Sequence, residues 1–182
     1  MNYSLFSLMI FTMIFFSCRT AKKSENIFEN KSFIPYTNGS YWVFKDSEGF
    51  VDTLKVLSSE KTADGLKVDL NSEKWLVKSP DSVFVRCQTR GGGEFTMPLF
   101  IKTKETTEYN TCLGDVVTQV DVKRLREPQV ISGKAFIDCT EYFIKPYTKV
   151  IVADRVGPVR YIYLDIDGTI KSERNLIDFK VN

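Results

Sequence analysis

Histidine is absent from this chain of 182 residues. Its absence excludes a Ser-His-Asp triad, a histidine-ligated metal and an imidazole proton shuttle. We also expect no other metal site, no cofactor and no catalytic residue, because no motif in the sequence indicates one. A hydrolase that works with carboxylates alone is left open, because the positions of the 23 acidic side chains in space do not follow from the sequence.

An excess of charge of one sign is also missing. The 25 Lys and Arg residues nearly balance the 23 Asp and Glu residues, which leaves a formal net charge of +2. This charge is spread evenly after residue 17, so there is no basic surface of the kind that nucleic-acid binding requires. We expect no nucleic-acid partner.

Hydrophobic runs long enough to span a bilayer are absent as well. The apolar run over residues 5–16 has 12 residues, whereas a membrane-spanning helix needs about 20. Its length, the lack of charge before residue 18 and the small residue Ser17 are typical of a secretory signal. We predict that residues 1–17 are a signal peptide.

The pair Ser17-Cys18 resembles the end of a bacterial lipobox, in which the chain is cleaved before a diacylated cysteine. With Phe15 and Phe16 upstream, it resembles the looser lipoboxes of Bacteroidota lipoproteins. The resemblance implies cleavage between Ser17 and Cys18 and lipidation of Cys18. Two or three acyl chains give stable membrane anchorage, whereas one chain binds only marginally.

Residues 18–32 are polar and too poor in apolar side chains to fold alone, so they are predicted to form a tether. Position 19 is Arg, not the Asp of the enterobacterial inner-membrane retention rule, and the tether lacks the acidic cluster linked to surface export. We therefore expect an outer-membrane lipoprotein that faces the periplasm and contacts the membrane through its lipid anchor.

From residue 33 onward, apolar and polar residues alternate with a period of two, as in half-buried strands. The pattern is clearest over residues 41–44, 66–70, 116–123 and 161–163. Turn signals such as Asn38-Gly39 and Asp64-Gly65 separate the runs, and no helical apolar period is sustained. The sequence predicts a mostly β, largely antiparallel single domain over residues 33–182, with few or no helices and about ten strands.

One segment, residues 161–170, resembles the hhhDxDGT motif of haloacid-dehalogenase-type phosphatases, with Asp165 and Asp167 in the places of its two catalytic carboxylates. That family has the motif on the first strand of a doubly wound sheet. Here too few residues follow Thr169 to form even one βαβ unit of about 30 residues. We predict instead a tight turn at Asp167-Gly168 that joins strand 159–166 to strand 169–181.

Three cysteines follow Cys18, at positions 87, 112 and 139. There is no C-x-x-C pair, so a metal site is not expected. In an oxidising compartment one pair can form a disulfide, and the sequence does not choose among Cys87, Cys112 and Cys139. The run Gly91-Gly92-Gly93 lacks the Lys and Ser or Thr of a phosphate-binding loop and is predicted to be a hairpin loop.

Three segments together resemble uncharacterised small outer-membrane lipoproteins of the Bacteroidota type. Residues 33–44 (FIPYTNGSYWVF) resemble their P-x-x-x-G-x-Y-W opening, residues 133–139 (GKAFIDC) a G-x-F-x-x-C strand start, and residues 156–161 (VGPVRY) their VG-x-V-x-Y closing hairpin. The resemblance implies a curved antiparallel sheet, a half-barrel or open barrel, with Trp42 in the core. Pro158 departs from the pattern and suggests that its strand begins at an unpaired edge position. No catalytic residue is implied.

Two functions fit these observations. The first is a non-enzymatic cell-envelope lipoprotein that binds an envelope protein or glycan or supports an assembly. The second is a carrier of lipid or another amphiphile, with an apolar groove in a half-barrel. The 10 Phe, 7 Tyr and 2 Trp residues that remain after residue 17 suit either function, because aromatic side chains on strands fill a core more often than they line a ligand site.

Overall fold

The computed structural model describes residues 33–72, 74–89, 91–103, 106–113 and 116–182, and every regular element in them is a β-strand. The prediction of a mostly β single domain with few or no helices is confirmed, although the described residues hold more strands than the ten expected. They are β1 (Tyr41–Asp46), β2 (Val51–Thr62), β3 (Gly65–Leu70), β4 (Lys74–Ser79), β5 (Ser82–Gln88), β6 (Glu94–Ile101), β7 (Thr107–Leu113), β8 (Val116–Arg124), β9 (Gln129–Ile131), β10 (Lys134–Phe136), β11 (Cys139–Ile144), β12 (Thr148–Ala153), β13 (Gly157–Leu164) and β14 (Ile170–Lys180).

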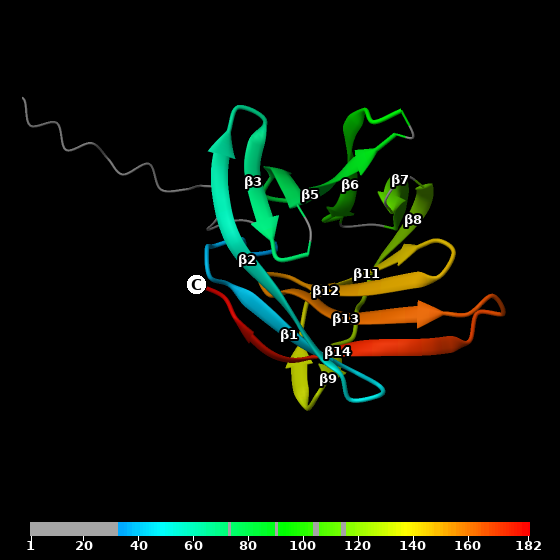
Figure 1. Ribbon diagram of the computed structural model, residues 1–182. Coiled ribbons are helices and arrows are strands. Elements are labelled where there is room, and N and C mark those ends of the chain that lie inside the picture. The colour runs from blue at the N-terminus through cyan, green and yellow to red at the C-terminus, as the bar shows by residue number, and fades with distance from the viewer. Residues whose placement is uncertain (1–32, 73, 90, 104–105, 114–115) are drawn as a thin grey trace, which may run out of the picture.

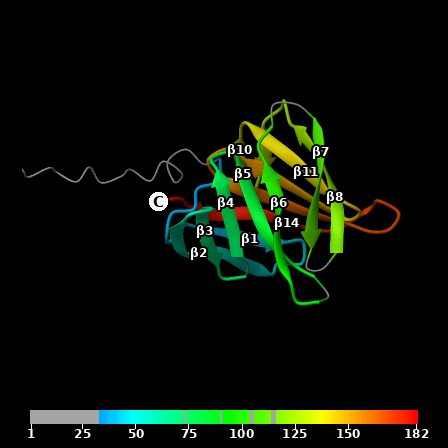
Figure 2. The ribbon, with the colours of Figure 1, turned by 90° about the horizontal axis from the view of Figure 1, so that it is seen from above.

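Twelve of these strands form one antiparallel sheet in the order β6-β5-β4-β3-β2-β1-β14-β13-β12-β11-β8-β7. Most neighbours in the sheet are also neighbours in the chain, as in a meander. The sheet curls until its two outer strands, β6 and β7, approach each other (Figures 1 and 2). The result is an open barrel with one seam, which confirms the expected curved antiparallel sheet.

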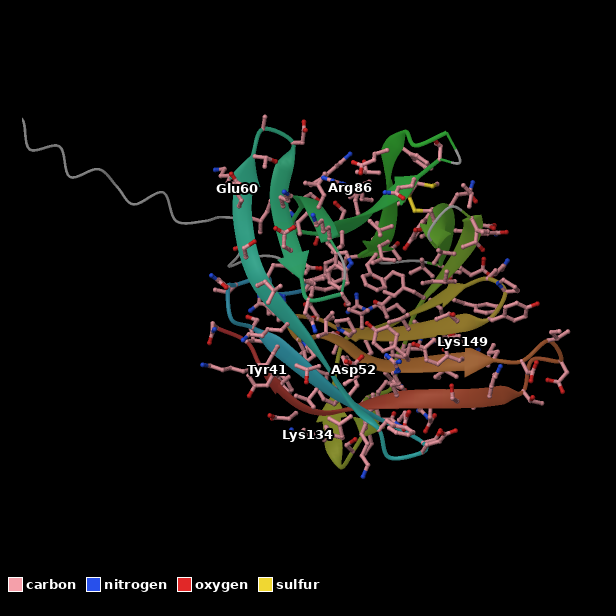
Figure 3. All side chains as sticks on the ribbon, viewed as in Figure 1. Tyr41, Asp52, Glu60, Arg86, Lys134 and Lys149 are labelled. Atoms are coloured by element: carbon pink, nitrogen blue, oxygen red, sulfur yellow. A yellow bond between two sulfur atoms is a disulfide. The ribbon has the colours of Figure 1, made fainter. Side chains whose placement is uncertain are left out.

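Side chains hold the seam together. The disulfide Cys87–Cys112 joins β5 to β7 and appears in yellow in Figure 3. The Tyr109 hydroxyl on β7 donates a hydrogen bond to the Leu99 carbonyl on β6 at 2.6 Å. The Tyr142 hydroxyl of β11 donates to the Ile101 carbonyl at 3.0 Å. The tertiary structure thus selects one of the three cysteine pairings that the sequence leaves open.

The order of the strands gives the barrel two different ends. The hairpins β1–β2, β3–β4, β5–β6, β7–β8, β11–β12 and β13–β14 all turn at one end, here termed the mouth end. The hairpins β2–β3, β4–β5 and β12–β13 turn at the opposite, closed end. Phe33 and Asn182 also lie at the closed end: the Phe33 amide donates to the Pro80 carbonyl between β4 and β5, and the Asn182 amide donates to the Ser40 hydroxyl.

Residues 33–36 fill the closed end of the barrel. Phe33, Ile34 and Tyr36 are all buried. The Arg155 amide donates to the Phe33 carbonyl at 2.6 Å, which fixes this segment against the β12–β13 turn. The apolar start of the domain is therefore part of the core.

The predicted turn at Asn38-Gly39 is present and places Trp42 in the core. The Ser40 amide donates to the Thr37 carbonyl at 3.0 Å, and Gly39 has a φ of 85°, which favours glycine. Trp42 is fully buried, and its indole Nε1 donates to the Val156 carbonyl at 2.5 Å. Burial of both the ring and its polar group in this way fixes β1 against the β12–β13 turn.

A small hairpin of β9 and β10 covers the outer face of the sheet near β14. The Phe136 ring lies 6.3 Å from the Phe179 ring, and Lys134 donates to the Ile177 carbonyl at 3.3 Å. Lys134 is labelled on this hairpin at the bottom of Figure 3. In a different part of the sheet, the last four residues of β12 (150–153) are all buried and show no alternation, so β12 is buried on both faces there.

The closing hairpin is confirmed at Asp167-Gly168, which joins β13 to β14. Gly168 has a φ of 82°, and Asp167 accepts hydrogen bonds from the amide and hydroxyl of Thr169. The expectation that Pro158 marks an unpaired edge is wrong, because β13 lies between β12 and β14 and Pro158 pairs with Val152 at a bulge. The ladder with β14 begins only at Arg160, so the missing N–H of Pro158 breaks no hydrogen bond on that side.

Candidate functional site: an apolar pocket inside the barrel

A pocket of about 370 Å³ lies inside the barrel. Its walls are formed by β4, β5, β6 and β7 on one side and by β11, β12 and β13 on the other. The aliphatic and sulfur-containing residues that line it are Val85, Leu99, Cys112, Ile144 and Val150. The other lining residues are Trp75, Phe100, Thr148, Tyr161 and Tyr163. The pocket is thus mainly apolar, with hydroxyl groups from three residues.

The pocket belongs to the mouth half of the barrel. Cys112 and Ile144 lie at the ends of strands that run toward the mouth, and Thr148 begins a strand that leaves it. Tyr161, Tyr163 and Val85 line the pocket yet are only half-buried. Solvent therefore reaches the pocket, whereas the closed half is filled by core side chains.

Aromatic rings form the floor of the pocket. Trp75 and Phe100 meet edge to face with 6.2 Å between ring centroids. Phe100 meets Tyr142 at 4.9 Å, and Trp75 meets Tyr36 of the N-terminal segment at 5.7 Å. This series of edge-to-face contacts is rigid because each ring is fixed by its neighbours, so the pocket is preformed.

The guanidinium group of Arg174 lies beside Tyr163 in the wall of the pocket. The Arg174 guanidinium carbon lies 5.8 Å from the centre of the Tyr163 ring, and its Nη1 lies 3.3 Å from Asp52 Oδ2. Asp52, labelled near the centre of Figure 3, lies at the start of β2 beside the β1–β2 hairpin. The side chains of Arg174 and Asp52 are 43% and 66% exposed, so a ligand head group can compete for this ion pair.

The buried tyrosines at the seam are hydrogen-bond donors and not acids. Burial raises the pKa of Tyr109 and Tyr142 far above the ordinary value, against a smaller lowering effect of the backbone hydrogen bond at Tyr109. Both hydroxyl groups remain protonated at any physiological pH. Their role in the described structure is to join the two sides of the seam.

Three acidic side chains, Asp52, Asp69 and Asp138, each contact a partner other than a carboxylate. Asp52 pairs with Arg174, Asp69 accepts from Ser58, and Asp138 pairs with Arg124 at 2.8 Å. A second, polar pocket of about 390 Å³ at the closed end includes Asp138 and Asp154. Asp81 also lines this pocket. Asp138 and Asp154 are both ion-paired, Asp154 with Lys102 at 3.0 Å, so neither of these two has the position of a free general base.

Among the residues that the structure describes, no group of three or more His, Cys, Asp or Glu side chains is placed to hold a metal. Likewise, no helix in the described ranges is long and apolar enough to cross a membrane. Gly91, Gly92 and Gly93 lie in the β5–β6 hairpin loop as predicted, with the Gly92 amide bonded to the Thr89 carbonyl at 2.9 Å.

Of the predicted site residues, Ser17 and Cys18 lie outside the described residues, as do the signal peptide (residues 1–17) and the tether (residues 18–32). Cys87 and Cys112 form the disulfide, and Cys139 is free and buried. Burial raises the pKa of the Cys139 thiol, a backbone hydrogen bond at Gln129 lowers it by less, and the nearby charge of Asp138 adds a still smaller increase. This thiol is therefore poorly ionised and unsuited to nucleophilic chemistry.

Sequence reasoning missed the pocket itself. Tyr161 and Tyr163 alternate with outward residues, which indicates that they share a face, but nothing local shows that this face lines a space and not a filled core. The members come from seven strands, so only the closure of the barrel brings them together.

No family model matches the chain, and no curated protein is similar to it in sequence. One solved structure that it resembles is the "Crystal structure of a putative lipoprotein from Parabacteroides distasonis ATCC 8503". The match covers 82% of this chain and 99% of that one at 15% identity, with a TM-score of 0.48. A likeness of this degree carries no conclusion about function.

Proposed function

We propose that this chain is a cell-envelope lipoprotein, anchored through Cys18, whose barrel binds a single-chain amphiphile in the pocket at its mouth end. Of the two functions that fit the sequence, this is the second, the amphiphile carrier. It is favoured because the barrel encloses a preformed apolar space, which has the chemistry of a small-molecule site.

The observation that supports the proposal most directly is the composition of the pocket. Its volume of about 370 Å³ lies near the lower end of the roughly 300–1,000 Å³ range of small-molecule sites. This size suits one acyl chain or a small ring system better than a two-chain phospholipid. The apolar floor at Trp75 and Phe100 and the polar groups nearer the mouth suit a molecule with one apolar and one polar end.

The position of the tether is compatible with this function. Phe33 lies at the closed end, so a tether over residues 18–32 leaves the barrel on the side away from the pocket mouth. A segment of 15 residues, the length of residues 18–32, spans roughly 20 Å on average as a random coil and at most about 50 Å when extended. An anchored barrel would therefore keep its mouth free of its own attachment point.

The pocket is tested by native mass spectrometry with dodecanoic acid as the probe ligand, on the chain from residue 18 onward with Cys18→Ser. Thr148→Trp places a large ring in the pocket, whereas Lys149→Trp adds the same ring to the next residue of β12, on the opposite face of the sheet. We expect a one-to-one adduct with the parental chain and with Lys149→Trp, and at least a tenfold loss with Thr148→Trp. Equal adducts in all three proteins would refute a ligand site in this pocket.

The anchor is tested separately by the intact mass of the protein extracted from membranes. We expect a chain that begins at Cys18 and carries a diacylglyceryl group. A mature chain that begins elsewhere, or lacks the acyl chains, would remove the anchor and leave the pocket proposal intact.

A further inference from the structure

Exposed apolar side chains are concentrated at the mouth end of the barrel. Eleven large apolar side chains are exposed among the described residues. Six of them lie on three mouth hairpins: Phe50 and Val51 at β1–β2, Val116 and Val117 at β7–β8, and Ile166 and Ile170 at β13–β14. Tyr147 at β11–β12 and Phe95 at β5–β6 bring the number to eight of eleven. Single exposed apolar residues are normal on any surface, but a concentration at one end points to a contact surface.

These side chains surround the opening of the pocket. The five hairpins come from all around the barrel, because their strands are spread over the whole sheet order from β6 to β7. In Figure 1 the tips of these hairpins follow the right-hand edge of the molecule from top to bottom. Phe50 is 70% exposed and Ile166 is 85% exposed, so the tips project into solvent and do not cover the core.

The arrangement suits a bilayer surface better than a folded partner. Separate hairpin tips around an opening form no continuous patch that a protein surface would match, whereas the interfacial region of a bilayer accepts scattered apolar side chains. The proposed ligand also points to a bilayer, since a single-chain amphiphile partitions into membranes and must leave one to enter the pocket.

The charge of the mouth end indicates which kind of bilayer. Among the described residues of the loops at 47–50, 71–72, 91–93, 145–147 and 165–169, one is basic, Lys145. Three are acidic, Glu48, Asp165 and Asp167, so the net charge of these loop residues is 1 − 3 = −2. Anionic head groups repel such a surface, whereas zwitterionic head groups do not.

We propose that the mouth hairpins dock on the surface of a zwitterionic phospholipid bilayer, so that an amphiphile can pass between the bilayer and the pocket. This inference rests on the proposed function for the nature of the ligand. The bilayer surface would then be the source from which the pocket takes its ligand and to which it returns it.

Flotation with vesicles tests the docking, using phosphatidylcholine vesicles and the chain from residue 18 onward with Cys18→Ser, which carries no acyl chains. The double variant Phe50→Ser/Ile166→Ser removes two apolar tips. The matched control is Val130→Ser/Ile137→Ser, whose residues are 71% and 69% exposed but lie outside the mouth hairpins. Each tip should contribute about tenfold to partitioning, so we expect a loss of roughly 100-fold in the mouth variant and less than twofold in the control.

Replacing half of the phosphatidylcholine by anionic phosphatidylglycerol should weaken binding at low salt. The inference is overturned if the parental chain does not float with phosphatidylcholine vesicles, if both double variants lose binding equally, or if anionic vesicles bind more tightly. Binding of dodecanoic acid in solution without vesicles tests the pocket alone, so a failure of docking can be distinguished from a failure of the proposed function. A mouth variant that still binds the acid but not vesicles supports docking, whereas a parental chain that binds vesicles but not the acid refutes the pocket function.

Discussion

Replacing Gly157 with alanine is predicted to destabilise the closed end of the barrel. Gly157 begins β13 with a φ of 105°, a conformation that L side chains rarely adopt. A Cβ at this position would lie 3.0 Å from Trp42 Nε1 and 3.1 Å from Ile34 Cγ2. Both neighbours are fully buried, and the Trp42 indole is fixed by its hydrogen bond to the Val156 carbonyl.

Two effects add in this variant. The backbone conformation costs about 1–2 kcal/mol for a residue with a Cβ. Contacts near 3 Å are closer than the optimum of about 3.5–4.0 Å, and such overpacking costs roughly 1–3 kcal/mol. The loss of chain entropy in the unfolded state offsets about 0.4–1 kcal/mol. We therefore expect Gly157→Ala to lower the free energy of unfolding by about 3 kcal/mol.

Urea unfolding followed by tryptophan fluorescence measures this loss, and Gly168→Ala is the matched control. Gly168 has a φ of 82°, and a Cβ added there would meet no atom within 4 Å, so this variant isolates the backbone contribution of about 1 kcal/mol. The difference between the two variants should be about 2 kcal/mol. If Gly157→Ala is no less stable than Gly168→Ala, the packing of Trp42 and Ile34 against Gly157 has been misjudged.

Three further predictions concern the seam, the mouth and the outer wall of the barrel. Replacing both Cys87 and Cys112 with serine should cost about 3.5 kcal/mol in urea unfolding, because the disulfide closes a loop of 25 residues; an unchanged midpoint would show that the seam is stable without it. Arg174→Gln should weaken binding of dodecanoic acid several-fold and leave binding of dodecanol unchanged in native mass spectrometry, since only the acid offers a carboxylate to the guanidinium; equal weakening of both would refute this role. The hydrogen bond from Arg160 lowers the pKa of Glu173 below its usual value, and burial opposes this with a smaller effect. The ionised carboxylate therefore stabilises the folded state at a pH above its unfolded pKa, and this stabilisation is lost as the pH falls through the folded pKa. Glu173→Gln should thus be less stable than the parental chain at pH 7 and converge with it at acidic pH, and a difference that stays constant with pH would contradict the assignment.

The secondary structure was predictable wherever alternation and turns were both clear. β1, β3, β8 and the closing hairpin β13–β14 follow the period of two and lie where the sequence indicated. β12 is harder to recognise because its last four residues, 150–153, are all buried and show no alternation. β6 contains Pro98, and a proline inside a run of residues argues against a strand when only the sequence is known. In the structure Pro98 pairs with Phe84 next to a bulge.

The sequence by itself determined the local properties of this protein: an all-β chain without histidine, with alternating apolar and polar faces on its strands and with the turn that places Trp42 in the core. These properties are local, because the direction of a side chain on a strand depends only on its neighbours in the chain. Tertiary structure alone decided which strands become neighbours, such as β1 and β14, and where the barrel leaves its seam. It also decided that Cys87 meets Cys112 and that residues of seven strands enclose a space instead of filling it. Those outcomes depend on how far the whole sheet twists and closes. The twist accumulates over all twelve strands, so it cannot be derived from any single segment of the sequence.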